Sequence, residues 1–164
     1  MEDHVRLMLN EARSRIHDAN ILSGSANRDS DSDALLRILG FEILLKCALV
    51  VEGCRPERTH NYVKLWQALP EVVRASVLDS AAARMPGQAD LSDIDGLLNR
   101  YQFVFERARY NYEMFEGYSD RERKELGELW VATGAVITEA LVQYSPQELE
   151  CLIHGLEQYI ESAP

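Results

Sequence analysis

Apolar residues recur at helical spacing along almost the whole chain. A first helix is predicted from about Asp3 to Ser23, and a polar run from Gly24 to Asp31 ends it. No stretch keeps the strict alternation of apolar and polar residues that is typical of a half-buried strand. The pattern therefore predicts an all-α protein.

The second predicted helix, from Asp33 to Glu52, is apolar nearly all round. A helix without a polar face is normally buried, so we expect it at the centre of a bundle or in a dimer interface. Its polar exceptions, Glu42 and Lys46, lie four residues apart. They are expected to pair on one face, and a solvated pair of this kind contributes about 0.2–0.5 kcal/mol.

Shorter helices are expected next. After the turn at Pro56, Thr59 or Asn61 is the expected N-cap of one, and Pro70 is expected to begin or kink another that runs to Arg84. Residues 85–90 are the clearest break in the chain.

From Leu91 to about Phe115 the apolar positions alternate steps of four and three residues. Such spacing predicts one helix with a seam that packs against other helices. Tyr112 lies on this seam and is expected in the core.

Two capping boxes are predicted further along the chain. Ser119 and Glu122 begin a helix whose apolar stripe continues to Leu141. Ser145 and Glu148 begin the last helix, with proline at its first position. Without repeats or long linkers, the 164 residues are expected to form a single domain, 1–164, an up-and-down bundle of about six helices.

The cysteine content and the apolar stretches exclude several kinds of site and membrane contact. The three cysteines, Cys47, Cys54 and Cys151, are odd in number and lack zinc-ligand spacing, so neither a disulfide framework nor a zinc site is expected. The common nucleotide-binding and metal-binding motifs are absent from the sequence, so no cofactor or metal is expected. The amino-terminal segment does not resemble a signal peptide, and the longest apolar stretch, 43–51, is too short for a membrane span. We therefore expect a cytoplasmic protein without a membrane partner.

The charge is unevenly distributed. Seventeen basic and 27 acidic residues give a net charge of −10, which disfavours non-specific binding to nucleic acid. From Arg100 to Lys124, however, there are six basic residues and five acidic ones. This segment is the expected place for an anion.

Three stretches carry a family resemblance. Residues 41–53 read FEILLKCALVVEG, residues 59–66 read THNYVKLW, and residues 107–113 read RARYNYE. Together they resemble the HEPN family of helical bundles over roughly half of the chain. The resemblance implies a homodimer in a stress, defence or toxin-antitoxin setting.

The resemblance also implies where catalysis belongs. Active HEPN ribonucleases carry an arginine with a polar neighbour and, after four to six intervening residues, a histidine, and two such motifs meet across a homodimer. Here Glu113 stands five intervening residues after Arg107, where histidine is expected, and Arg109 reaches no histidine. If the protein cleaves RNA, the candidate catalytic residues are Arg107, Arg109 and Glu113 with His60.

Histidine 60 has another possible partner in the sequence. The single arginine with a histidine after four intervening residues is Arg55, paired in this way with His60. Because Pro56 places that match in a turn, we interpret it as chance. Near a helix start His60 is expected to bond backbone, or else to approach Arg107 or Arg109 across the bundle.

A binding role is the main interpretation of the segment around Arg107. Arg107, Arg109, Tyr110 and Asn111 offer guanidinium, phenol and amide donors that suit a phosphate, a nucleotide or an acidic peptide. The alternative is a solvated face on which Glu106 and Glu113 pair with the arginines.

The leading hypothesis is therefore a non-catalytic HEPN-like homodimer that binds a nucleotide, RNA or a protein partner. One alternative is a metal-independent endoribonuclease of the HEPN type. Another is a structural adaptor whose acidic surface binds a basic protein.

Overall fold

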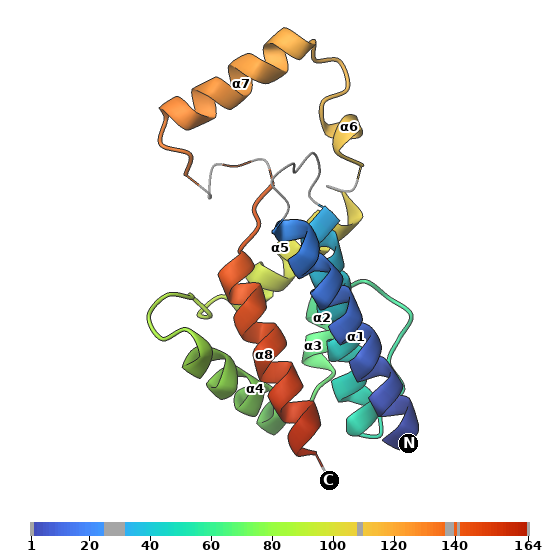
Figure 1. Cartoon of the computed structure of the whole chain (residues 1–164). Coiled ribbons are helices and arrows are strands. Elements are labelled where there is room, and N and C mark those ends of the chain that lie inside the picture. Colours follow the sequence, from blue (N-terminus) through green and yellow to red (C-terminus); the bar gives the residue numbers. More distant parts are fainter. Residues whose placement is uncertain (1, 25–31, 108–109, 137–139, 141, 164) are drawn as a thin grey trace.

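Helix α2 (Ser32–Val51) lies at the centre of the bundle in the computed structural model, which describes residues 2–24, 32–107, 110–136, 140 and 142–163. It packs against α1 (Glu2–Ser23), α3 (Tyr62–Gln67), α5 (Ile94–Glu106) and α8 (Pro146–Ser162) (Figure 1). All regular elements in these described ranges are helices, so the predicted all-α class is confirmed.

The apolar surface of α2 is covered within one chain. Ile38, Phe41, Leu44 and Leu45 have no exposed surface. Of the two positions predicted for α2, the structure shows the centre of a bundle, because α1, α3, α5 and α8 together surround it. Homodimerisation itself stays a prediction.

Local capping explains where α3 begins. The Asn61 side chain accepts a hydrogen bond from the Lys64 backbone N–H at 2.8 Å, as predicted for an N-cap. Thr59 supports the turn by accepting the Asn61 N–H at 3.0 Å.

Helix α4 (Glu71–Arg84) follows Pro70 as predicted and packs against α8. The two helices approach closely at Gly155. A Cβ atom added there would lie only 2.3 Å from the carbonyl oxygen of Val77. Glycine is therefore required by this helix contact.

The single helix predicted from Leu91 to Phe115 is wrong. Helix α5 ends at Glu106, and a separate short helix, α6 (Asn111–Met114), follows. Tyr112, expected in the core, is 72% exposed, whereas Tyr101 is fully buried. The apolar pattern continues beyond the end of the core, and without packing a periodic segment does not remain one helix.

Helix α7 (Asp120–Ala132) begins with the predicted capping box, in which Ser119 and Glu122 bond each other's backbone N–H groups. Its predicted packing is not found, since α7 has no buried residue. Figure 1 shows α7 apart from the bundle. The later stripe positions Ile137 and Leu141 lie outside the described residues.

The second capping box is absent, and that prediction is wrong. Ser145 makes no side-chain cap bond, and Glu148 instead accepts the Asp90 backbone N–H at 3.1 Å. The Ser145 carbonyl accepts a hydrogen bond from the buried Tyr101 hydroxyl at 2.8 Å. Proline does occupy the first turn of α8, as predicted. The predicted apolar stripe is buried, at Leu149, Leu152, Leu156 and Ile160.

The length and hydropathy of each helix decide whether it could cross a membrane. In the part of the chain that the structure describes, none is both long and apolar enough to cross a bilayer.

Two helical glycines provide a matched test of the packing. Gly155→Ala should lower the free energy of unfolding by about 1–3 kcal/mol, because the new methyl group overlaps the α4 backbone. Gly127→Ala in α7 meets no atom within 4 Å and should cause no loss. Urea denaturation followed by circular dichroism measures both. Equal midpoints for the two variants would contradict the close contact of α4 and α8.

Candidate functional site

The predicted site residue Arg107 lies at the end of α5. Its backbone N–H donates to the Phe103 carbonyl at 2.8 Å and caps the helix. The side chain is exposed and forms no ion pair with the described residues. A cation at a helix carboxyl end also stabilises the helix dipole, so this position has a structural explanation.

The other predicted ligand-binding residues are only partly described. Arg109 lies outside the described residues, as does the side chain of Asn111. Tyr110 is 41% exposed and its ring packs edge-on against that of Tyr112, with centroids 6.4 Å apart. A convergence of Arg107 and Arg109 therefore stays a prediction.

The acids of the alternative ion-paired face do not pair with Arg107 in the described structure, and their pairing with Arg109 lies outside the described residues. Glu113 accepts a hydrogen bond from the Tyr112 hydroxyl at 3.2 Å, and Glu106 accepts one from Gln102. The bond to Glu113 raises the pKa of Tyr112.

His60 contacts a carboxylate rather than an arginine. Its Nδ1 lies 2.8 Å from Glu42 Oε2, and Lys46 Nζ donates to the other oxygen of Glu42 at 2.7 Å. Glu42 is 4% exposed, so the pair with Lys46 is not the solvated contact that the sequence suggested. A buried carboxylate requires such partners, and α2 and the turn before α3 supply them.

The environment of His60 also defines its chemistry. A carboxylate on Nδ1 favours the tautomer that keeps the proton there and leaves Nε2 able to accept one. The ring is half exposed and packs against Phe105 of α5, with centroids 5.0 Å apart. His60 therefore approaches the end of α5, but the described side chains show no hydrogen bond between it and Arg107.

The Arg55 and His60 match does not form one site. Arg55 lies beside Val50 near the end of α2, whereas His60 binds Glu42. Eight residues separate these two positions of α2, or about 12 Å along a helix. The interpretation of this motif as chance agrees with that separation.

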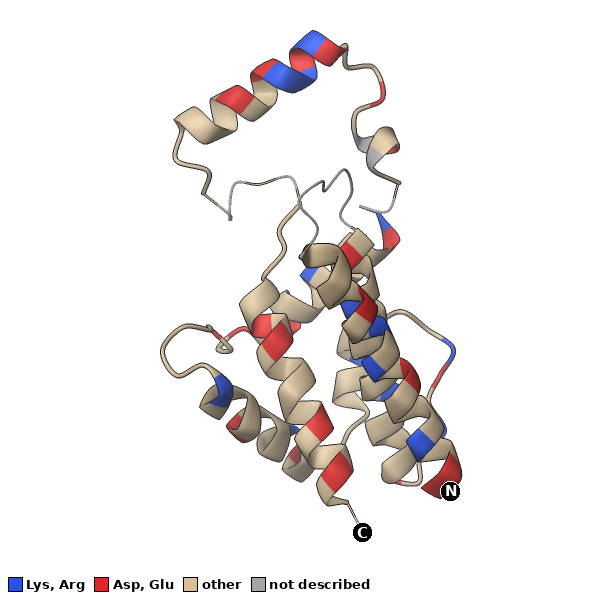
Figure 2. Ribbon diagram, viewed as in Figure 1, with Lys and Arg blue, Asp and Glu red and all other residues tan. Residues whose placement is uncertain are grey.

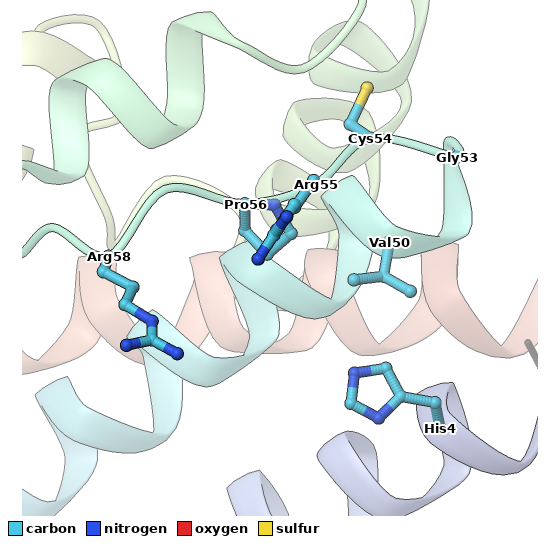
Figure 3. Close-up of a pocket in the computed structure, with 7 residues that line it drawn as sticks. All are labelled: His4, Val50, Gly53, Cys54, Arg55, Pro56 and Arg58. Carbon is cyan, nitrogen blue, oxygen red and sulfur yellow. The ribbon is translucent and has the colours of Figure 1, made fainter.

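A separate pocket of about 450 Å³ lies where α2 ends. Figure 3 shows Arg55 and Arg58 in the loop after α2, with His4 of α1 facing the same hollow. The remaining lining residues are Val50, Gly53, Cys54 and Pro56. None of these described lining residues carries a carboxylate.

The turn before the pocket depends on Gly53. Its φ of 70° is left-handed, and the Gly53 and Cys54 N–H groups donate to the carbonyls of Val50 and Leu49. These two bonds form a Schellman motif that ends α2. The chain then turns sharply and carries Arg55 and Arg58 onto the surface.

The acids next to the pocket in sequence, Glu52 and Glu57, contact residues other than Arg55 and Arg58. The Tyr159 hydroxyl donates to Glu52, and Lys64 binds Glu57 at 2.7 Å. Burial, followed by the bond to Glu52, raises the pKa of Tyr159 to about 12. Among the described residues neither Arg55 nor Arg58 has an ion-pair partner.

The end of α2 does not neutralise these arginines. A helix carboxyl end carries roughly half a negative charge. The two guanidinium groups carry two positive charges. The pocket therefore keeps a net positive charge in a chain of net charge −10.

A metal site and a reactive buried thiol have little support within the described ranges. No three His, Cys, Asp or Glu side chains gather there as metal ligands. Cys47 and Cys151 are buried thiols, and burial raises the pKa of Cys47 to about 11. Cys54 is exposed, and Figure 3 shows its sulfur turned away from His4.

Sequence reasoning missed His4 and Arg58 as site residues. A local signal was present, since two arginines follow the glycine that ends a long helix. The contribution of His4 had no such signal, because it depends on how α1 lies against α2.

Comparison with known proteins adds no assignment. No family model matches this chain, nor does any curated protein or solved structure.

The buried carboxylate can be tested through stability. Glu42→Ala should lower the free energy of unfolding by about 3–5 kcal/mol, because it leaves Lys46 without its partner in a poorly solvated position. Glu57→Ala breaks an exposed pair with Lys64 and should cost less than about 1 kcal/mol. Chemical denaturation of both variants measures the difference, and similar losses would show that Glu42 is not a buried charge.

Proposed function

We propose that this protein is a non-catalytic binding protein that holds phosphate groups of RNA or a nucleotide in the pocket at the end of α2. The observation that supports this proposal is the pair of arginines, Arg55 and Arg58, without acidic partners among the described residues. Guanidinium groups bind phosphate through paired donors, and the ring of His4 offers a further N–H donor.

The charge distribution favours binding of a single anionic group over binding along a nucleic-acid strand. The charges of the described helices are mixed, as Figure 2 shows. The net charge of −10 repels RNA at long range, so the proposed contact is limited to the one or two phosphates that the pocket can reach.

The proposed setting rests on the HEPN resemblance. It is stress response, defence or a toxin-antitoxin pair, and the proposed working form is a homodimer. Fold-level resemblance alone is weak support for function, so the pocket residues carry the argument.

The double variant Arg55→Gln/Arg58→Gln should bind a fluorescein-labelled single-stranded RNA about tenfold more weakly, because two phosphate contacts are lost. The slope of log affinity against log salt should also fall by about 1.4, or about 0.7 per contact. Fluorescence anisotropy at several salt concentrations measures both quantities, with inorganic pyrophosphate as a competitor.

The matched control is Arg15→Gln/Arg121→Gln. It removes the same charge from two arginines that already bind glutamates. This control should keep the wild-type affinity and slope. If both double variants lose affinity equally, net charge rather than the pocket determines binding, and the proposal fails.

The second candidate function is a metal-independent endoribonuclease, and the Glu42–His60 contact favours it. A histidine held by a carboxylate can take the proton from a ribose 2′-hydroxyl through Nε2. This function stands second because such cleavage also needs a cation on the phosphate, and the described cation that meets His60 at a shared residue, Lys46, is already paired with Glu42.

Cleavage of mixed RNA in the presence of EDTA tests that candidate. His60→Asn keeps an amide donor for Glu42 but removes the base, so it should abolish cleavage while the fold stays intact. Arg107→Ala/Arg109→Ala should have the same effect if these arginines hold the phosphate. Absence of cleavage by wild-type protein would exclude this candidate and leave the binding proposal standing.

A further inference from the structure

A second, smaller cavity adjoins the cationic pocket at the end of α2. It has a volume of about 130 Å³ and lies between the loop after α2 and helix α3. Three consecutive residues, Cys54, Arg55 and Pro56, line both cavities. The two cavities therefore flank one short stretch of chain. The segments that form the smaller one, 49–57 and 64–68, are described throughout.

The smaller cavity differs from the pocket in its chemistry. Leu49, Leu65 and Ala68 supply an apolar floor together with the ring of Pro56. Leu49 and Leu65 are each 2% exposed, so this floor is part of the packed core. An apolar cavity beside a cationic pocket suits a ligand with two unlike parts, an anionic group and a compact apolar group.

A hydrogen-bond donor and an acceptor lie at the edge of the smaller cavity. Lys64 Nζ binds Glu57 Oε2 at 2.7 Å, and the two side chains are 59% and 60% exposed. Such an exposed pair is weak, so either partner can turn to a ligand at little cost. The ammonium group has three N–H donors, and the contact with Glu57 uses one of them. The cavity thus combines polar contacts at its edge with apolar ones at its floor.

A nucleobase has the same distribution of polarity. Its ring faces stack on flat side chains, whereas its edge carries hydrogen-bond donors and acceptors. An acyl chain would leave the polar edge of the cavity unused, and a sugar would place hydroxyl groups against the apolar floor. The volume of about 130 Å³ is below the roughly 300–1,000 Å³ of pockets for larger ligands, so it has room for one base.

We propose that the ligand is a nucleoside monophosphate, with its phosphate on Arg55 and Arg58 and its base in the smaller cavity. The proposal rests on the proposed function and deepens it, because it names a nucleotide as the ligand in preference to RNA. The net charge of −10 supports this choice, since it repels a polyanion more strongly than a single nucleotide.

The spacing of the two cavities suits one nucleotide. From Cys54 to Pro56 the chain makes two Cα–Cα steps of about 3.8 Å each, so the stretch that the cavities share is short. In a nucleotide one ribose separates the phosphate from the base. Arg55 lines both cavities. Its guanidinium group can bind phosphate through its N–H groups and stack on a base through its planar face.

The thiol of Cys54 offers a direct readout of the smaller cavity. Cys54 is the exposed cysteine of the chain, whereas Cys47 and Cys151 are buried. Figure 3 shows its sulfur turned away from His4, and Cys54 also lines the second cavity. Adenosine 5′-monophosphate should therefore slow the alkylation of Cys54 by iodoacetamide several-fold. Inorganic phosphate should leave the rate unchanged, because it binds in the cationic pocket alone.

A comparison of two phosphates isolates the contribution of the base. In isothermal titration calorimetry, adenosine 5′-monophosphate should bind about tenfold more tightly than ribose 5-phosphate, which lacks the base. Ala68→Trp fills the cavity from an exposed position at the end of α3, so it should reduce the first affinity to the second and leave the second unchanged.

The matched control for this variant is Val72→Trp. It adds the same ring at a position that is 75% exposed and lines neither cavity, so it should change neither affinity. Both variants should keep the wild-type denaturation midpoint, because neither original side chain is buried.

Three outcomes would overturn the proposal. Equal affinities of the wild-type protein for adenosine 5′-monophosphate and ribose 5-phosphate would exclude the base cavity. A folded Ala68→Trp variant that binds adenosine 5′-monophosphate as the wild type does would exclude it too. Stronger protection of Cys54 by single-stranded RNA than by the mononucleotide would show that the choice of ligand is wrong.

Failure of this proposal is distinguishable from failure of the proposed function. If Arg55→Gln/Arg58→Gln still weakens the binding of ribose 5-phosphate, the phosphate pocket stands although the base cavity is excluded. If the double variant binds every phosphate as the wild type does, both proposals fail.

Discussion

The burial of α2 is the constraint on which the rest of the structure depends. A helix that is apolar nearly all round must be covered on every side, and α1, α3, α5 and α8 are arranged to do so. Glu42, one of its two buried acids, then requires partners within that cover, and Lys46 and His60 provide them. Its carboxyl end requires a reversal at Gly53, which carries two arginines to the surface. Both candidate sites therefore follow from α2, one from its burial and the other from the turn that ends it.

Electrostatics separates these two sites. Glu42, which contacts His60, is buried and bound by its partners, so its loss would destabilise the fold. The arginines near Gly53 are exposed, and the acids beside them in sequence, Glu52 and Glu57, bind Tyr159 and Lys64 instead. Positive charge therefore remains in a strongly acidic protein at one small pocket. A localised cationic pocket suits recognition of a single anionic group better than it suits binding along a polymer.

Helix α7 shows the difference between forming a helix and packing one. Its capping box and charge pairs stabilise the helix locally, and all of these contacts lie within a few residues in sequence. Its apolar residues Leu126, Leu129 and Trp130 are exposed in the described structure. A helix of this length normally gains most of its stability from packing, which local contacts alone do not supply.

Local sequence determined the helical class, most helix starts and the central position of α2, because capping and periodicity act within a few residues. The Asn61 cap and the Ser119 box are examples. It also placed His60 near a helix start, but it did not identify Glu42 as its partner or His4 as a neighbour of Arg55. Those contacts join residues far apart in sequence, and only the packing of α1, α2 and α5 decides them. The same reason explains the end of α5 and the exposed Tyr112, since a periodic pattern does not reveal where the core stops.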